Sequence, residues 1–465
     1  MATNKALSIL IVVLLSVSLS GCDQDVLEET KKSVSDTFES GNIGEVVKVS
    51  FNKWSLSIAD DNDNPELPEA WRCWWYVKMK DLDIENKTEI TIKNSGWPYY
   101  YLPVYSYDQK EWFHFYEDEV TQNENNEIVI TKYFDYGTVW IARFYPYTFT
   151  DLENYIEILK RSSKVDIQIP GYTRRGKPIY VFKVTDPDVP VTGKKRIFIH
   201  ARTHSAETPP SFLIEGMMDY LLCGSRAANE ILAGIEFYIF PMQNVEGVIA
   251  GNYRSTPRSE NLEVMWFFDN ANPFNLTEAT PPEVKVIQQY ASDLMTDGGP
   301  PITIALNLHA SNSEPDIRPF FYPHFGPASN GYSPEEASLW NKQLSFIDCV
   351  AKNYGYDMIE PITGDGGNSF ATKTYPESWW WVNFKDKVMA MTFEMTYGRA
   401  GYSPEWVTPG DLRELGVALT YGIRDYYNVP VNSDQTKLKA SRKIRIRDLK
   451  YPELYPPAAL DEMKE

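Results

Sequence analysis

The chain has 465 residues, of which 43% are apolar and 23% charged. This composition is typical of a globular protein and excludes a disordered chain. Its 64 acidic and 45 basic residues give a formal net charge of −19 at pH 7, which argues against nucleic acid as a partner. A chain of this length favours two domains over a single hydrophobic core.

The N-terminal segment is typical of an export signal. Lys5 precedes an apolar run that ends at Leu19, and Leu19-Ser20-Gly21-Cys22 resembles the cleavage site of a bacterial lipoprotein. The run is too short to favour a membrane-spanning helix. We therefore expect residues 1–21 to be removed and Cys22 to carry lipid, which would anchor the chain to a bacterial membrane outside the cytoplasm, in the periplasm or at the cell surface. The alternative is an ordinary secretory signal in which Cys22 has no such role.

The polar residues 22–45 are predicted to be a tether. In residues 46–145, short runs rich in β-branched and aromatic residues alternate with clusters of Asn, Asp, Gly and Pro, which predicts an antiparallel β-sandwich domain. Trp74, Trp75 and Trp112 in this domain could stack on sugars, but core packing is the favoured interpretation.

Residues 146–430 contain apolar runs that alternate with longer helical patterns. This texture predicts an α/β domain with a mixed, largely parallel sheet flanked by helices. The expected strands are 197–200, 235–240, 302–308 and 388–393, and the expected helices are 209–222 and 334–353. The remaining residues, 431–465, form a polar tail that we interpret as a solvated or surface-packed segment.

Polar side chains follow several of the predicted strands. His204 and Glu207 come after the strand 197–200, and His309 and Glu394 directly end two other strands. Imidazole and carboxylate groups are zinc ligands, although a single His-x-x-Glu pair also arises by chance. Since ligands bind at the carboxyl ends of strands in open α/β sheets, these segments could converge in one crevice. A shared site is favoured over a set of unrelated core histidines and strand-end carboxylates.

The chain resembles the zinc metallocarboxypeptidase family, in its cytosolic carboxypeptidase-like branch, over roughly residues 46–430. The matching stretches are Tyr145 to Leu152, Gly176 to Ile179, Ala201 to Pro209, Gly251-Asn252-Tyr253-Arg254, Asn307-Leu308-His309 and Thr392 to Gly398. The branch has a β-sandwich before its catalytic domain, which agrees with the order of domains predicted here.

The resemblance implies a role for each of five residues. His204, Glu207 and His309 would hold one zinc ion per chain, and Glu394 would act as general base and then general acid. Arg254 would stabilise the oxyanion formed at the scissile carbonyl. Three protein ligands leave one position for a water molecule, whose pKa zinc lowers from about 15.7 toward 7.

The chain departs from the family at one motif. The family pattern Asp-x-Asn-Arg orients a zinc ligand and clamps the terminal carboxylate of the substrate, and it aligns here with Asn261-Leu262-Glu263-Val264. Asn261 would then take the orienting role, whereas an anionic Glu263 would repel a carboxylate. A replacement clamp could come from Arg258, Arg318 or Arg399, and Arg258 is nearest in sequence to Arg254.

A tyrosine often completes the site in this family. Tyr375 lies in a predicted loop between His309 and Glu394, but Tyr397 and Tyr402 compete with it, and each could equally be an ordinary surface or core residue. The run of tryptophans at 379–381 could line a pocket, although packing is its more usual role.

We expect the protein to hydrolyse peptide bonds with zinc, most simply by removing C-terminal residues from a peptide or peptide-like substrate. One alternative is a zinc amidase, or a peptidase that does not require a free terminal carboxylate. The other is a lipoprotein that binds glycan or peptide without catalysis. The complete ligand set, together with Glu394 and Arg254, favours an enzyme.

Overall fold

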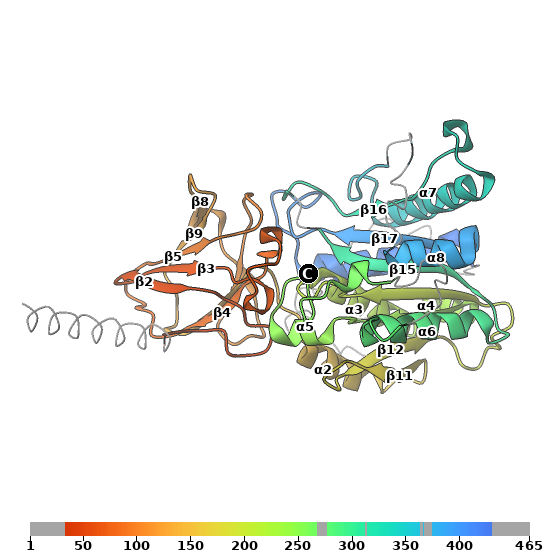
Figure 1. Cartoon of the computed structure of the whole chain (residues 1–465), viewed down its shortest axis with the longest axis horizontal. Helices are drawn as coiled ribbons and strands as arrows, with labels where there is room; N and C mark the ends of the chain where they lie inside the picture. The colour runs from red at the N-terminus through yellow and green to blue at the C-terminus, as the bar shows by residue number, and fades with distance from the viewer. Residues whose placement is uncertain (1–32, 267–276, 312–313, 363–365, 367–373, 430–465) are drawn as a thin grey trace, which may run out of the picture. The chain divides into compact units, whose positions relative to one another are not determined.

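The computed structural model describes residues 33–266, 277–311, 314–362, 366 and 374–429 (Figure 1). The chain divides into two compact units between Phe144 and Tyr145. Cys22 and the predicted C-terminal tail lie outside the described residues. In the described part of the chain, we find no helix with the length and apolar character needed to cross a membrane.

The first unit contains two five-stranded sheets. One sheet has the order β1-β4-β10-β6-β7 and is antiparallel throughout, and the other has the order β2-β3-β5-β9-β8 with one parallel pair, β3 and β5. The strands are β1 Val34–Ser35, β2 Val46–Ser50, β3 Lys53–Ser57, β4 Tyr76–Met79, β5 Thr88–Lys93, β6 Val104–Ser106, β7 Phe113–His114, β8 Val120–Gln122, β9 Ile128–Lys132 and β10 Val139–Ala142.

Alternate residues of β5, β6 and β9 are buried, as expected for strands with one face against a core. In β5, for example, Ile90 and Ile92 are buried while Thr91 between them is partly exposed. Trp74 and Trp75 are also buried, and the indole of Trp75 donates a hydrogen bond to Tyr101 Oη at 2.9 Å. These two tryptophans therefore pack in the core and do not present a sugar-binding surface.

The first unit begins earlier than the sequence suggested. Val34 and Ser35 pair with β4, and Asn42 forms a β-bridge with Tyr76. The ring of Phe38 packs edge-on against Tyr76 at a centroid distance of 4.7 Å. This aromatic anchor explains why a stretch that is polar overall, and was assigned to the tether, is part of the folded unit from residue 34.

The second unit is built on a seven-stranded sheet with the order β11-β12-β14-β13-β15-β17-β16. The four central strands, β14, β13, β15 and β17, are parallel, and the outer pairs are antiparallel. The predicted mixed sheet is therefore confirmed, with the parallel part confined to its centre. The strands are β11 Val165–Tyr172, β12 Pro178–Val184, β13 Lys195–Ala201, β14 Ile235–Phe240, β15 Ile302–Ala310, β16 Phe320–Tyr322 and β17 Met389–Met395.

Helices cover both faces of this sheet, which explains why β14 is buried along its whole length. Apolar side chains of α6 and α8 pack with Phe198, Phe240 and Ala305 in one core cluster. The other layer contains α3, α7 and α9, which pack against one another. The helices are α2 Phe149–Leu159, α3 Pro209–Leu222, α4 Arg226–Gly234, α5 Val245–Ala250, α6 Pro282–Thr296, α7 Pro334–Tyr354, α8 Pro376–Phe384 and α9 Pro409–Tyr426.

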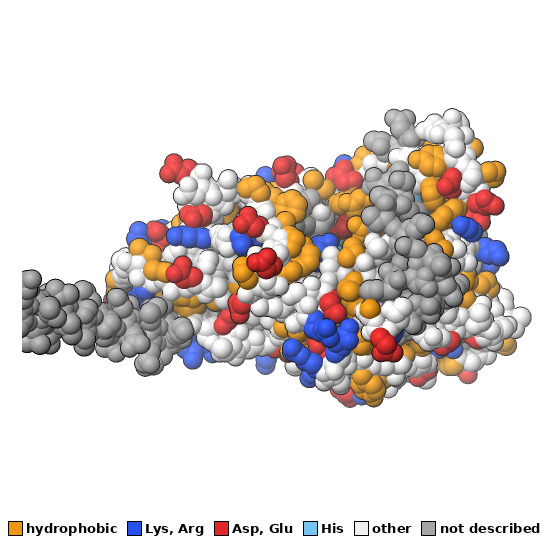
Figure 2. Space-filling view, in the orientation of Figure 1, with side chains coloured by type: hydrophobic (Ala, Val, Ile, Leu, Met, Phe, Trp, Pro, Cys, Tyr) orange, Lys and Arg blue, Asp and Glu red, His pale blue; other side chains and the backbone are white. Residues whose placement is uncertain are grey.

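Acidic and basic side chains are interspersed over the face of the molecule that Figure 2 shows. The excess of acidic residues is thus spread among basic ones on this face.

Candidate metal centre and active site

The carboxyl ends of three parallel strands meet at one edge of the seven-stranded sheet. Ala201 at the end of β13 lies beside Leu308, and His309 near the end of β15 lies beside Glu394 of β17. His204 follows three residues after the end of β13. The topology therefore places the predicted ligands and the predicted base at the same edge, where ligands bind in open α/β sheets.

A buried arginine shapes the turn that carries His204 and Glu207. Arg202 has a φ of 58° and is 2% exposed. Its guanidinium donates hydrogen bonds to Ser205 O, to Tyr147 O at 3.1 Å and to Ser211 Oγ at 2.9 Å. Burial lowers the pKa of Arg202 to about 10. The turn between β13 and α3 is thus fixed around one side chain, as precise ligand placement requires.

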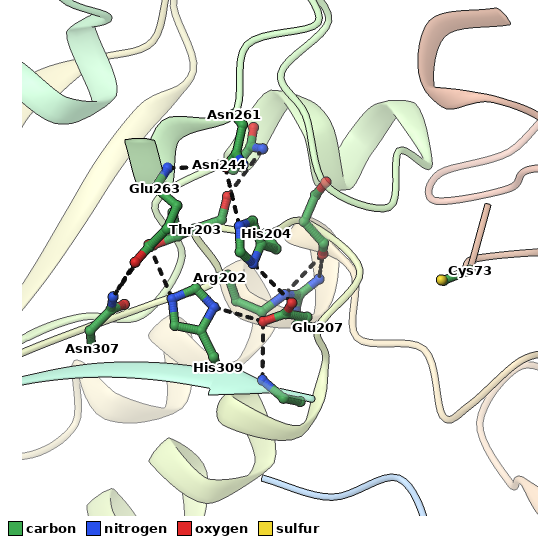
Figure 3. A network of polar contacts seen from close by, with 12 residues as sticks. Cys73, Arg202, Thr203, His204, Glu207, Asn244, Asn261, Glu263, Asn307 and His309 are labelled. Carbon is green, nitrogen blue, oxygen red and sulfur yellow. Dashed lines mark hydrogen bonds and ion pairs between the residues drawn. The ribbon is translucent and has the colours of Figure 1, made fainter. Parts of the chain in front are cut away.

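The carboxylate of Glu207 lies between the two histidines (Figure 3). Its Oε1 is 2.9 Å from His204 Nδ1, and its Oε2 is 2.8 Å from His309 Nδ1. The backbone N–H of Ala310 also donates to Oε2 at 3.0 Å. All three ligand side chains are buried. The structure therefore brings together the three residues that the sequence proposed as metal ligands.

The outer nitrogens of both imidazole rings face oxygen atoms that can accept a hydrogen bond. Asn261 Oδ1 accepts the backbone N–H of Glu263 at 3.1 Å, so it is also the acceptor for His204 Nε2 at 3.2 Å. A carboxylate oxygen of Glu263 accepts from His309 Nε2 at 3.1 Å. With its proton on Nε2, each ring would present the lone pair of its Nδ1 toward Glu207, which is the state of a histidine that ligates a metal.

Two nitrogen lone pairs that face a carboxylate repel it unless a cation lies among them. A proton on His309 is one such cation: burial lowers the pKa of His309, but Glu263 and Glu207 outweigh this and hold it well above its ordinary value. Burial likewise raises the pKa of Glu207, yet His204 and His309 bring it well below its usual range. A metal ion satisfies all three groups at once, and two imidazole nitrogens with a carboxylate form a zinc ligand set.

Glu263 also lies close to the two histidines. One ligand atom from each of His204, Glu263 and His309 lies within 4.8 Å of the others. However, Glu263 accepts from His309 Nε2 and from Asn307 Nδ2, the latter at 3.0 Å and 3.3 Å to its two oxygens. It therefore contacts the outer side of the His309 ring, while Glu207 faces the Nδ1 side.

Glu394 lies at the end of β17 with Oε2 buried. Within the described ranges, this oxygen has no hydrogen-bond partner. Burial raises the pKa of Glu394 to about 8; Glu207 and Glu263 also raise it, and His309 and Arg254 lower it. An uncommitted buried carboxyl beside a metal centre can accept a proton and later return it.

Arg254 belongs to a loop that is bonded to the ligand turn. The backbone N–H of Ala206 donates to Tyr253 O at 2.9 Å, and Ser205 Oγ donates to Asn252 O at 2.9 Å. Burial lowers the pKa of Arg254, but Tyr253 and the carboxylates of Glu207, Glu263 and Glu394 outweigh burial and raise it. The guanidinium is thus within electrostatic reach of the ligand Glu207 and of the candidate base Glu394.

The three arginines proposed as a replacement clamp differ in their partners. Arg318 donates two hydrogen bonds of 3.0 Å to the carboxylate of Glu360. Arg399 pairs with Asp316 at 2.9 Å. The side chain of Arg258 is 64% exposed, and its nearest carboxylate, that of Glu260, is 3.9 Å away. Arg258 is therefore the one of the three whose ion pair is loose enough to be exchanged for a substrate carboxylate.

The three candidate tyrosines differ in their exposure and contacts. Tyr375 precedes α8 and is 36% exposed, whereas Tyr402 bonds to Tyr354 and Tyr397 is buried. Tyr322 of β16, which the sequence analysis did not select, interacts electrostatically with both Glu394 and Tyr375, and burial raises its pKa. Tyr375 thus lies on the side of Glu394, together with Tyr322.

Two tryptophans of the predicted pocket run have a packing role. Trp379 and Trp380 are 1% exposed and belong to the core cluster with α6. Trp381 packs against Phe325 at a centroid distance of 4.6 Å. The interpretation of these residues as packing material, which the sequence favoured, agrees with their burial.

Sequence reasoning missed the contribution of Glu263 and Asn307 to the site. Glu263 was interpreted as facing the substrate, but it is 6% exposed and bonded to His309. One signal was available in the sequence, since Asn307 is two residues before His309 on the same strand. Residues i and i+2 of a strand lie on the same face, so Asn307 and His309 can share a partner.

Comparison with known proteins agrees with this geometry. Residues 152–273 match the profile of the family described as Zinc carboxypeptidase, and residues 34–144 match that described as Cytosolic carboxypeptidase N-terminal domain. The match to the zinc carboxypeptidase family lies within the second unit. The matched range contains His204, Glu207 and Arg254, while His309 and Glu394 lie beyond it and are placed by the fold.

Two proteins described as cytosolic carboxypeptidases are similar in sequence to much of this chain. Cytosolic carboxypeptidase 3 of Mus musculus is 26% identical over 364 residues, which cover 72% of this chain and 33% of that protein. Cytosolic carboxypeptidase 6 of Caenorhabditis elegans is 25% identical over 327 residues, which cover 66% of this chain and 68% of that protein. The chain thus spans about a third of the length of the mouse relative.

The fold is shared with bacterial enzymes of known structure. A metallo-carboxypeptidase from Burkholderia cenocepacia has a TM-score of 0.68 at 18% identity, covering 85% of this chain and 98% of that one. A metallo-carboxypeptidase from Pseudomonas aeruginosa has a TM-score of 0.69 at 18% identity, covering 85% and 99%. The predicted fold, a β-sheet domain followed by a carboxypeptidase-like α/β domain, is confirmed.

Proposed function

We propose that the protein is a metallocarboxypeptidase that holds one zinc ion per chain and removes C-terminal residues from peptides. The observation that carries the proposal is the position of the Glu207 carboxylate, 2.9 Å and 2.8 Å from the Nδ1 atoms of His204 and His309. With both Nε2 atoms donating to oxygens, the inner atoms of the three side chains form a donor set suited to zinc.

A bound zinc ion would supply Lewis acidity and a nucleophilic water near neutral pH. The protein would supply the proton transfers and the charge stabilisation. Glu394 can accept a proton at its buried Oε2 and deliver it to the leaving amine nitrogen. Arg254 can donate to the oxyanion that develops on the scissile carbonyl, because its charge already interacts with Glu207 and Glu394.

Recognition of a terminal carboxylate would rest on Arg258. Its side chain is 64% exposed and loosely paired, and its backbone N–H donates to Thr256 Oγ1 at 3.2 Å within the same loop as Arg254. Because Glu263 is bonded to His309 and Asn307, its charge is partly compensated. Tyr375 could then contact the substrate from the side of Glu394.

The substitution of Val264 for the clamp arginine favours a second candidate, a zinc amidase or a peptidase that accepts blocked C-termini. Val264 is 39% exposed and cannot pair with a carboxylate. Both candidates share the metal ligands, Glu394 and Arg254. They differ in whether the substrate must present a free carboxylate near Arg258.

A peptide-library digest with mass-spectrometric readout tests these proposals. Each peptide is supplied with a free and with an amidated C-terminus, and Glu394→Gln serves as the inactive control. Loss of single residues from free C-termini alone supports the carboxypeptidase. Equal cleavage of free and amidated peptides replaces it with the amidase. Absence of zinc-dependent cleavage, together with glycan or peptide binding, favours the non-catalytic alternative.

We also propose that lipid on Cys22 anchors the protein to a bacterial membrane, outside the cytoplasm. The support is the run Leu19-Ser20-Gly21-Cys22 after an apolar segment. Cys22→Ala should move the protein from the membrane fraction to the soluble or unprocessed pool, measured by fractionation and intact mass. Membrane retention of a correctly cleaved, unlipidated variant would contradict the anchor.

A further inference from the structure

We infer that Glu263 is a positioning residue for the metal centre, which strengthens zinc binding by holding the His309 ring and adding negative charge behind it. The inference rests on the proposed zinc site and goes beyond the three ligands. It also assigns a role to a side chain that the sequence analysis interpreted as repelling the terminal carboxylate of the substrate.

The contact between Glu263 and His309 is buried and specific. Glu263 Oε2 lies 3.1 Å from His309 Nε2, and the two side chains are 8% and 3% exposed. Asn307 Nδ2 donates to both oxygens of the same carboxylate, at 3.0 Å and 3.3 Å. A carboxylate held by two partners fixes the plane of the imidazole ring.

The outer partners of both histidine rings come from one short segment, residues 261–264. Asn261 precedes the 3₁₀ turn Leu262–Val264, and its Oδ1 accepts the Glu263 backbone N–H at 3.1 Å. The same Oδ1 accepts from His204 Nε2 at 3.2 Å. Position 261 therefore orients His204, and position 263 orients His309 (Figure 3). The two rings are fixed relative to each other because their outer partners are two residues apart.

The two partners differ in charge. Asn261 is neutral, whereas Glu263 is anionic and lies behind the His309 ring. A carboxylate that accepts the outer N–H of a ligating histidine raises the basicity of the inner nitrogen, and loss of such a partner typically weakens metal binding by about 10- to 100-fold. The effect should therefore be larger at Glu263 than at a neutral position.

The test is the zinc dissociation constant of the full chain, measured by competition with a coloured chelator. Glu263→Gln keeps the size of the side chain and one acceptor oxygen but removes the charge. We expect its zinc dissociation constant to rise by about 10- to 100-fold. Glu283→Gln is the matched control, because Glu283 is 2% exposed and lies on α6, and it should leave zinc binding unchanged.

Cobalt substitution provides a readout that a purely structural role would not move. The visible absorption of bound Co²⁺ depends on the strength and direction of its ligands, so Glu263→Gln should shift the bands and Glu283→Gln should not. Asn307→Ala removes one partner of Glu263 and leaves its charge and its contact with His309. It should weaken zinc binding by less than about 10-fold, and a larger loss would overturn the inference even if Glu263→Gln does not fold.

The inference is overturned if Glu263→Gln binds zinc as tightly as the wild type, or if Asn307→Ala weakens binding at least as much as Glu263→Gln. The second result would assign the effect to packing of the turn. Failure of the proposed function is distinguishable, because in that case the wild type itself would bind no zinc or cleave no peptide.

Discussion

The two histidines of the candidate metal centre come from different kinds of segment. His204 lies three residues from Glu207 in one turn, which the buried guanidinium of Arg202 holds in place. His309 lies at the end of a strand, and its outer partner Glu263 is 46 residues earlier in the sequence. The local half of the site, His204 and Glu207, can be recognised from the spacing of the two residues in the sequence. The distant half, His309 with Glu263 and the neighbouring Glu394, depends on the order of strands in the sheet.

The largest effect is expected from a substitution of His309, in the distant half of the site. His309→Ala should abolish stoichiometric zinc binding, because two protein ligands no longer complete a site that holds about one zinc per chain. Metal analysis after dialysis against buffer without zinc measures this. His114→Ala, in the first unit, is the control and should retain its zinc. Equal zinc content in His309→Ala and wild type would remove His309 from the site.

The next largest effect is expected from a substitution of Glu394, which should lower turnover without loss of zinc. Glu394→Gln should retain zinc, because Glu394 is not one of the three proposed ligands, while turnover falls by a factor on the order of 100 to 10,000. Steady-state kinetics on a peptide cleaved by the wild type, with zinc content measured in parallel, provides the test. Near-normal turnover in a zinc-loaded variant would rule out proton transfer by Glu394.

A substitution of Arg254 tests the role of the loop that is hydrogen-bonded to the turn of His204 and Glu207. Arg254→Ala should lower kcat by about 100- to 1,000-fold, or roughly 2.7 to 4 kcal/mol in transition-state stabilisation, with zinc retained. A change confined to KM would indicate that Arg254 binds the ground state of the substrate and does not act on the oxyanion.

The smallest expected effect lies outside both halves, at Arg258. Arg258→Ala should raise KM about tenfold for peptides with a free C-terminus, equivalent to roughly 1.4 kcal/mol, and should leave amidated peptides nearly unaffected. The paired Arg318 is a suitable comparison, since Arg318→Ala should not produce this difference between free and amidated peptides. Equal losses for both kinds of peptide would contradict a carboxylate clamp at Arg258.

Local pattern was sufficient to predict much of the fold. The helix expected at 209–222 and the strand expected at 235–240 have the bounds of α3 and β14. In both cases Pro, Gly or a change of periodicity marks the ends, and the apolar run is long enough to leave one interpretation. The start of the first unit at β1 was missed because its pairing with β4 is a long-range contact in a polar stretch.

The part of the site that lies at strand ends could be predicted from the sequence. His309 and Glu394 end apolar runs, and parallel pairing in register brings them side by side. The residues around Glu263 did not reveal its role, because nothing in them distinguishes a carboxylate that repels substrate from one that turns inward to a histidine; the one signal was the position of Asn307 on the strand of His309. Its direction is set by Asn307 and by the capping contact with Asn261.

X-ray absorption at the zinc edge tests the central claim most directly, because it reports the ligands of the bound metal. The account predicts nitrogen and oxygen ligands at about 2.0 to 2.2 Å, with the outer-shell scattering of two imidazole rings. Glu207→Gln should change this spectrum and weaken binding. Sulfur scattering near 2.3 Å, or the signature of other than two imidazoles, would contradict a centre formed by His204, Glu207 and His309.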